Sequence, residues 1–406
     1  MIEKYYSGVI EQIYNRIGKE TRNIVMANYS NDFSIENLEV IRRYQSNEDN
    51  VFFAYSEFSY NTLVGAYEPF LDIICNMHRR FIGGSFDDFQ KECGVYYLHR
   101  QVLNSYYETG ECFREETVLL NEVAYEQRRM TMAIADMLKR LSEVRPLMIV
   151  INRFQMASKS SIETIKYLID NPCANIGIVL GVNAIVKGAD STVEVWDRIV
   201  ESLEDRSAIY YIGSAGPLKN NIKTTNDDEL YITMNFEQSI QEASNIMEFL
   251  DYEQARRGCR IIEHKIKFEN AWIDEKSLRR FYLVYARTSV LLGEMSKAIE
   301  LMNEYKALIP ENDSEHYFSL YYFMKGTCYM YQGKLEKAEG CAKKAYDYAL
   351  LADDELLEFK SELLSVMIKM SGWYNIFFCV QDIPVSDEII EKLIKHGYRN
   401  HLAHIY

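Results

Sequence analysis

The sequence lacks the features that define several broad classes of protein. No run of about 18 apolar residues occurs, so no membrane-spanning helix is expected. The 8 cysteines include no Cys-x-x-Cys pair, which argues against zinc ribbons, iron–sulfur clusters and thioredoxin-like redox chemistry. Only 6 of the 406 residues are proline, and no segment has the composition of a disordered linker. A chain of this length has room for two or three domains with cores of their own.

Positive charge is also scarce. There are 45 Lys and Arg residues against 60 Asp and Glu residues, which gives a formal net charge of -15. Binding to a polyanion needs clustered Lys and Arg, so no direct contact with nucleic acid or with an anionic membrane is expected, and a basic partner, or none, fits the charge better. The amino terminus shows no charged region followed by an apolar core, so we expect a cytoplasmic protein without a secretory signal.

No constellation of catalytic or metal-binding residues is evident. The sequence contains no nucleophile elbow, no Cys-His pairing pattern and no Rossmann fingerprint. His401 and His404 are three residues apart, but a metal site needs further ligands and none is indicated. We therefore expect neither a catalytic residue nor a bound metal ion.

The first half of the chain contains short apolar runs separated by helical patterns. The helix expected over residues 3–18 has its apolar residues at three- and four-residue spacing. Apolar runs typical of buried parallel strands follow at residues 23–26, 51–55, 147–151, 176–180 and 208–212. Strands that alternate with helices predict a parallel sheet with flanking helices, because parallel neighbours need a crossover. We assign this α/β domain to residues 1–235.

The second half, residues 236–406, is helical and repeats. A Gly and an Ala five residues apart occur at Gly293 with Ala298 and again, 40 residues later, at Gly333 with Ala338. Gly372 follows Gly333 after a further 39 residues. Periods of this length predict stacked helical hairpins, in which small residues let two helix backbones approach closely.

One loop resembles a phosphate-binding P-loop. Residues 24–38 read as a strand, an eight-residue loop and a helix, and the fixed Gly, Gly, Lys and Ser/Thr places of the family fall on Ala27, Asp32, Phe33 and Ser34. The family binds phosphate through loop amides, the helix amino terminus and the Lys. Here Asp32 adds a negative charge and Phe33 removes the cation, so the resemblance implies a nucleotide site of which only the Ser34 hydroxyl survives.

A second stretch, residues 147–168, resembles the Walker B region of the STAND branch of AAA-like signalling ATPases. The matching positions are Phe154, Gln155, Ala157, Ser160 and Ser161. In the family, two acidic residues at the strand end hold Mg²⁺ and orient the attacking water. Asn152 and Arg153 stand in their places, so the resemblance implies that hydrolysis by the usual route is lost.

Two shorter segments extend the resemblance. Residues 66–70 are similar to the Pro-Tyr-x-Pro-Phe segment that opens the next STAND helix. Residues 178–183 are similar to the sensor strand, which in the family usually ends in Arg and here ends in Asn183. A generic α/β domain is the alternative to this family.

The helical half resembles tetratricopeptide repeats. The family's large, small and aromatic positions fall on Tyr322, Gly326, Tyr329, Ala338 and Ala345, and the preceding unit offers Tyr282, Ala286, Ala298 and Pro310. The period of about 40 is longer than the usual 34 residues, as in the extended repeats of bacterial STAND regulators. Residues 250–255 suggest an earlier, more divergent unit.

These resemblances imply a regulator rather than an enzyme. We expect a pseudo-ATPase scaffold, able to form homo-oligomers, whose helical repeats bind a protein or peptide. One alternative is an active nucleotide switch in which Ser34 and Arg153 reach the phosphates, with ATP and Mg²⁺ as ligands. Another is that the chain is the sensor part of a longer regulator with an output domain beyond Tyr406.

Overall fold

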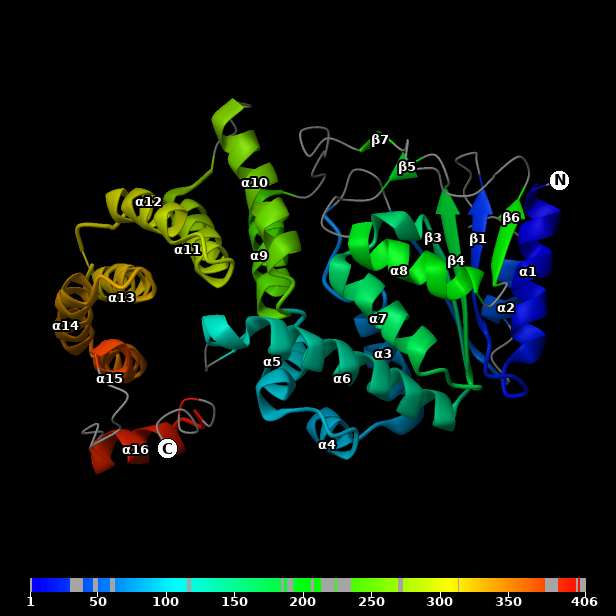
Figure 1. The fold of residues 1–406 in the computed structure, drawn as a ribbon, viewed down its shortest axis with the longest axis horizontal. Helices are drawn as coiled ribbons and strands as arrows, with labels where there is room; N and C mark the ends of the chain where they lie inside the picture. The colour runs from blue at the N-terminus through cyan, green and yellow to red at the C-terminus, as the bar shows by residue number, and fades with distance from the viewer. Residues whose placement is uncertain are drawn as a thin grey trace. The chain divides into compact units, whose positions relative to one another are not determined.

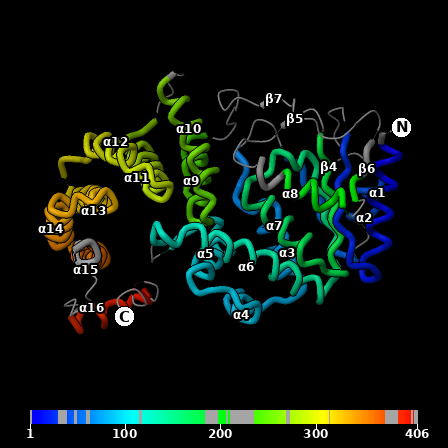
Figure 2. The backbone as a smooth tube through the Cα atoms, in the orientation of Figure 1, coloured from blue at the N-terminus to red at the C-terminus, as the bar shows by residue number. Residues whose placement is uncertain are grey.

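The computed structural model describes residues 2–29, 39–46, 50–58, 63–114, 118–183, 186–187, 193–205, 208–212, 223–224, 235–268, 273–312, 314–376, 386–398 and 401. The chain divides into two compact units. The first comprises Met1–Arg114 with Glu122–His264, and the second comprises Glu115–Asn121 with Lys265–Tyr406 (Figures 1 and 2). None of the helices in these described ranges has the length and apolar character that crossing a bilayer requires.

The first unit is built on a five-stranded parallel sheet with the strand order β2-β3-β4-β1-β6. Its strands are β1 (Ile24–Tyr29), β2 (Phe52–Glu57), β3 (Leu147–Asn152), β4 (Ile176–Asn183) and β6 (Ile209–Ile212). Two short strands, β5 (Val186–Lys187) and β7 (Lys223–Thr224), pair separately. Every residue of β3 and β4 is buried, as expected of parallel strands covered by helices on both faces. The parallel α/β architecture predicted from the apolar runs is therefore confirmed.

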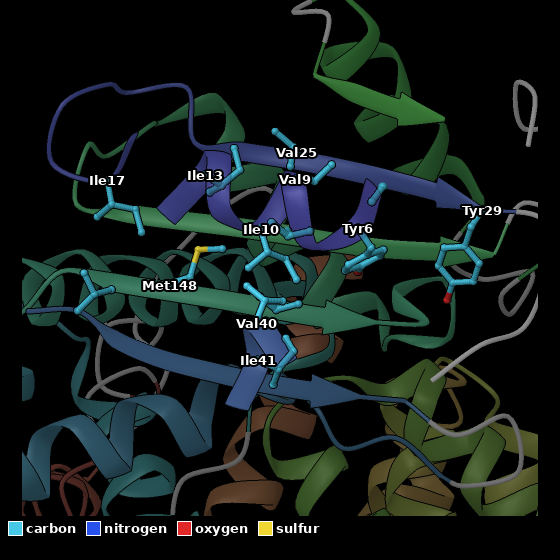
Figure 3. Packing of buried hydrophobic residues seen from close by; sticks show 14 residues of the cluster. Tyr6, Val9, Ile10, Ile13, Ile17, Val25, Tyr29, Val40, Ile41 and Met148 are labelled. Carbon is cyan, nitrogen blue, oxygen red and sulfur yellow. The ribbon is translucent and has the colours of Figure 1, made fainter. Parts of the chain in front are cut away.

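Helices α1 (Ile2–Arg16) and α2 (Glu39–Ser46) cover one face of this sheet (Figure 1). The apolar residues that share one side of α1 pack on the strands, as Figure 3 shows. This core consists mainly of Tyr6, Val9, Ile10 and Ile13 of α1, Val25, Ala27 and Tyr29 of β1, Val40 and Ile41 of α2, and Met148 and Val150 of β3. The apolar residues of α1, spaced three and four positions apart, thus form one hydrophobic face that packs on the sheet.

The remaining helices of the first unit lie on the other side of the sheet or follow it (Figure 1). They are α3 (Phe70–Met77), η1 (His78–Ile82), α4 (Phe86–Glu92), α5 (Tyr97–Thr109), α6 (Val123–Val144), η3 (Phe154–Met156), α7 (Lys159–Asp170), α8 (Val193–Glu204), α9 (Phe236–Glu248) and α10 (Tyr252–Phe268), and the short η2 (Leu120–Glu122) lies where the chain passes from the second unit back into the first. The Ser158 side chain accepts a hydrogen bond from the Ser161 amide and caps α7. A helix therefore follows β3, in line with the alternation of strands and helices that the sequence predicts.

The connection between α9 and α10 and the first turn of α10 form hydrogen bonds to other parts of the first unit. Asp251 Oδ2 accepts a hydrogen bond from the Ser160 amide at 3.1 Å, and Gln254 Nε2 donates to the Val64 carbonyl at 3.0 Å. The first unit accordingly runs to His264, whereas the sequence pattern changes near residue 235. Residues 250–255, taken from sequence as the start of a divergent repeat, join the two helices that pack on the α/β core.

The second unit consists of helices that pack as successive antiparallel hairpins (Figure 1). They are α11 (Glu275–Leu291), α12 (Met295–Ala307), α13 (Glu315–Tyr331), α14 (Leu335–Leu351), α15 (Glu355–Ile376) and α16 (Asp387–Lys395). The four predicted packing alanines, Ala286, Ala298, Ala338 and Ala345, are fully buried. A Cβ at Gly326 would lie 3.0 Å from Leu364 and 3.3 Å from Cys341, so this glycine does serve close helix packing.

Gly293 and Gly333 do not serve close helix packing, which is the role that the sequence pattern suggests for them. Gly293 and Gly333 follow the first helix of their hairpins with φ of +79° and +72°, and a Cβ there would meet no atom within 4 Å. They are needed for the left-handed turn rather than for close packing. Gly372 does not continue this pattern, because it lies inside α15 instead of at a turn.

We expect Gly333→Ala to lower the free energy of unfolding of the repeats by about 1 kcal/mol, because alanine is strained at positive φ. The control is Gly340→Ala in α14, where the glycine is exposed, helical and has open space around it. That change should stabilise by about 1 kcal/mol through helix propensity. Thermal unfolding followed by circular dichroism measures both, and shifts of the same sign would contradict the assignment.

Candidate functional site

The candidate site is the edge of the sheet where the parallel strands end. β1, β2, β3 and β4 end in Tyr29, Glu57, Asn152 and Asn183. The strand register places Tyr29 beside Asn183 and Glu57 beside Asn152. In open parallel sheets, ligands bind outside the carboxyl ends of the strands where the order of connections reverses. Here β1 lies between β4 and β6, so the reversal falls at β1 and β4.

A hydrogen bond crosses this edge from β1 to β3. Tyr29 Oη donates to Asn152 Oδ1 at 2.7 Å, and both residues are fully buried. The two side chains span the intervening strand β4 above Gly181, where a Cβ would lie 2.3 Å from Tyr6 Oη and 2.8 Å from Asn152 Oδ1. The space over Gly181 is thus filled by side chains of the protein itself.

Tyr6 completes this cluster from α1. Its ring meets the Tyr29 ring edge-on, with centroids 6.5 Å apart, and Figure 3 shows both residues on the α1 side of the sheet. Burial raises the pKa of Tyr6 well above its usual value, and the nearby Tyr29, Tyr55 and Glu57 add to the rise. The Tyr6 hydroxyl therefore stays protonated at physiological pH, and its role here is packing rather than proton transfer.

Arg153 forms an ion pair across the same edge. Its Nη1 lies 3.2 Å from Glu57 Oε1 and donates to the Phe58 carbonyl at 3.4 Å. The two side chains are only 19% and 17% exposed. Arg153 has a φ of 55°, a left-handed conformation that turns the chain from β3 into η3. The guanidinium charge is therefore balanced by the carboxylate at the end of the neighbouring strand.

Asn183 and Gln155 connect the ends of β3 and β4. The Asn183 amide donates to Gln155 Oε1 at 3.3 Å, and both residues are buried. The fold thus brings together the three predicted residues Asn152, Arg153 and Asn183, which lie up to 31 positions apart in the sequence.

The predicted loop is only partly described, and its start needs a correction. Ala27, assigned to the first P-loop place, lies within β1, where it pairs with Gly181 of β4 and with Tyr210 of β6. The strand continues through Tyr29 because it has a hydrogen-bonding neighbour on each side. Asp32, Phe33 and Ser34 lie outside the described residues.

Sequence reasoning missed Glu57, Tyr29 and Tyr6. Glu57 ends the strand whose apolar run was recognised only to residue 55, and Tyr29 was placed in a loop. Tyr6 was read only as part of a helix face. A polar residue directly after an apolar run was the available signal for Glu57, since strand ends of a parallel sheet meet at one edge.

A hollow of about 350 Å³ lies beside the end of β2 within the first unit. Its carboxyl groups come from Glu57, Glu68, Asp72 and Glu242. Burial raises the pKa of Glu242 to about 7, and the charges of Glu68 and Asp72 add to the rise. Burial also raises the pKa of Glu68. The hollow is therefore less negative at neutral pH than four carboxyl groups would suggest.

Metal-binding groups were also sought in the described ranges. Among those residues, no cluster of three or more His, Cys, Asp or Glu side chains is placed to hold a metal ion. His401 is buried with its ring 5.5 Å from that of Tyr398, and His404 lies outside the described ranges.

The chain was also compared with known proteins. No family model matches it. No curated protein matches it either.

Proposed function

We propose that this chain is a regulatory scaffold in which a P-loop-related α/β domain without hydrolytic activity accompanies tetratricopeptide-like repeats that bind a protein or peptide. The observation that supports the proposal best is the occupation of the sheet edge by Tyr29, Asn152, Arg153 and Glu57, which bond to one another. A site for a nucleotide and its metal needs open space and free charge in this region. Here Tyr29 is paired with Asn152, and Arg153 is paired with Glu57.

The donor set at this edge does not fit Mg²⁺. The metal prefers carboxylate, phosphate and water oxygens in octahedral geometry. Of the residues that end β1 to β4, only Glu57 carries a carboxylate, and it is paired with Arg153. The Asn152 oxygen already accepts from Tyr29. No step of ATP hydrolysis is therefore assigned to these residues.

The repeats support the binding part of the proposal. Helical hairpins that contact only their neighbours form extended surfaces on which partners dock. Tyr282, Tyr322 and Tyr329, at the family's large and aromatic positions, are half-buried, so part of each ring faces solvent. Aromatic side chains of this kind are frequent anchors of protein interfaces.

Titration of the full chain with Mg·ATP tests the proposal. We expect no heat of binding at micromolar ATP and no phosphate release, because Glu57, the carboxylate among the described ends of β1 to β4, is paired with Arg153. Low-micromolar binding with turnover contradicts the proposal.

Arg153→Ala serves as the matched variant in this titration. If ATP binds and this change abolishes its affinity, Arg153 contacts the nucleotide and the chain is an active switch. If neither the wild type nor the Arg153→Ala variant binds ATP, the result supports the scaffold proposal.

A further inference from the structure

One face of α13 carries an alternation of tyrosine and lysine. Tyr321, Lys325 and Tyr329 follow one another at four-residue spacing, which places them on the same side of the helix. Lys325 Nζ donates to Tyr321 Oη at 2.9 Å and lies 5.0 Å and 5.9 Å from the ring centroids of Tyr321 and Tyr329. The ammonium group is thus held between two aromatic rings.

Lysines of the neighbouring helices join this face. Lys306 of α12 has its Nζ 5.5 Å from the Tyr321 ring centroid. Lys334 and Lys337, at the start of α14, lie 6.0 Å and 5.9 Å from the Tyr329 ring centroid. We call the six residues Lys306, Tyr321, Lys325, Tyr329, Lys334 and Lys337 the lysine–tyrosine surface. Cation–π contacts of this kind hold the ammonium groups near the rings.

The four lysines are not neutralised by the protein. No ion pair in the described part of the chain involves any of them, whereas Lys392 in the same unit pairs with Glu362 at 2.7 Å. Lys306, Lys334 and Lys337 are exposed. Gathered like charges repel one another, and the repulsion is relieved when an anion binds. This local excess of positive charge contrasts with the formal net charge of the whole chain, which is -15.

We propose that the lysine–tyrosine surface binds an acidic polypeptide segment of a partner protein. The carboxylates would sit between the ammonium groups, and apolar or aromatic side chains of the segment would pack on the half-buried Tyr329 ring, while Tyr321, which is buried, would hold Lys325 in place from beneath. This proposal rests on the proposed partner-binding function of the repeats and specifies the partner as acidic, which the total charge alone did not suggest. A long nucleic acid fits less well, because the net negative charge of the chain repels an extended polyanion.

Fluorescence anisotropy of the full chain tests the proposal with four labelled probes. They are a twelve-residue peptide of Glu and Tyr, the same peptide with Gln in place of Glu, the same peptide with Lys in place of Glu, and a twelve-nucleotide oligothymidine. We expect the Glu peptide to bind at least tenfold more tightly than the other three. Its affinity should fall as salt rises from 50 to 200 mM, because salt screens the contacts.

Variants locate the binding. Lys325→Gln combined with Lys337→Gln should weaken binding of the Glu peptide at least tenfold. The matched control, Lys343→Gln combined with Lys369→Gln, changes two exposed lysines outside the surface and should leave the affinity within twofold. Thermal unfolding of both variants establishes that the repeats remain folded, so that a loss of binding is not a loss of structure.

The outcomes separate this proposal from the function on which it rests. Binding of the Glu peptide that the Lys325/Lys337 variant does not weaken overturns the surface but leaves partner binding by the repeats intact. Tighter binding of the oligothymidine overturns the acidic-peptide proposal in favour of a nucleic-acid surface. Failure of all four probes to bind also overturns the acidic-peptide proposal. The Mg·ATP titration tests the scaffold function independently.

Discussion

Replacing Gly181 with alanine is expected to lower the free energy of unfolding of the first unit by about 3 kcal/mol. The added Cβ would lie 2.3 Å from Tyr6 Oη and 2.8 Å from Asn152 Oδ1, both closer than any van der Waals contact allows. Neither neighbour has room to move. Tyr6 is fully buried in the core between α1 and the sheet, and Asn152 is held by its hydrogen bond to Tyr29. The strain must therefore be taken up by the strand or by α1.

Urea unfolding followed by circular dichroism measures this loss, and hydrogen exchange of the β4 peptide locates it. Gly8→Ala is the control, because Gly8 lies in α1 with nothing within 4 Å of its missing Cβ, and it should be stabilising by up to about 1 kcal/mol. Combining Tyr6→Phe with Gly181→Ala removes the nearer clash and should recover part of the loss. A Gly181→Ala protein as stable as the wild type would refute the packing described over β4.

The second large effect is expected at a buried contact between a histidine and a carboxylate in the helical part of the first unit. His99 of α5 and Glu126 of α6 are both buried, and His99 Nε2 lies 3.1 Å from Glu126 Oε2. Arg129 contacts the other carboxylate oxygen at 3.1 Å. His99→Leu removes a neutral partner of a buried carboxylate, which keeps its contact with Arg129, and should destabilise the unit by about 2 kcal/mol at pH 7.

The same substitution should change how stability depends on pH. Burial lowers the pKa of His99 to about 4, below its ordinary value of 6.5. The unfolded chain therefore takes up the proton first, and stability that is present above pH 6.5 is lost as the pH falls toward 4. Over this range the wild type should lose about 3 kcal/mol through His99, and the His99→Leu protein should not. The stability difference between the two proteins thus shrinks on acidification.

A carboxyl group outside this contact also titrates in this window. Glu242, with its pKa raised to about 7, contributes with the opposite sign, and it is common to both proteins. Parallel pH profiles of the wild type and the His99→Leu protein would show that His99 is not held neutral by burial.

The control for the buried contact is an exposed ion pair on the same helix, Arg140 with Glu143. Arg140→Ala should lower the free energy of unfolding by no more than about 0.5 kcal/mol.

The sequence predicted the α/β core well, because its strands are short apolar runs that a buried parallel sheet requires. The exceptions lie at strand ends. The segment from Ala27 to Tyr29 reads as a loop by composition, and it is a strand because β4 and β6 supply hydrogen-bonding partners on both sides. Such pairing depends on strand order, which local patterns do not encode.

The sheet edge could be predicted only in part for the same reason. Asn152, Arg153 and Asn183 are predicted as site residues only through the resemblance to the Walker B and sensor segments of the STAND family. Their partners are not predicted, because Glu57 and Arg153 are 96 residues apart and their contact depends on the register of β2 with β3. In the repeats, Gly293 and Gly333 were found by spacing, but their positive φ follows from a turn geometry that spacing alone does not reveal.

The hydrogen bond between Tyr29 and Asn152 also limits how readily metal ligands could be introduced at the sheet edge. An aspartate introduced at residue 152 would find the Tyr29 hydroxyl already 2.7 Å away and would be satisfied by it without a metal ion. A second acid at residue 153 would face Glu57 in place of the arginine that now balances it. Building a metal site from two acids at residues 152 and 153 would therefore also require changes at Tyr29 and Glu57, which would otherwise bind or face the new carboxylates.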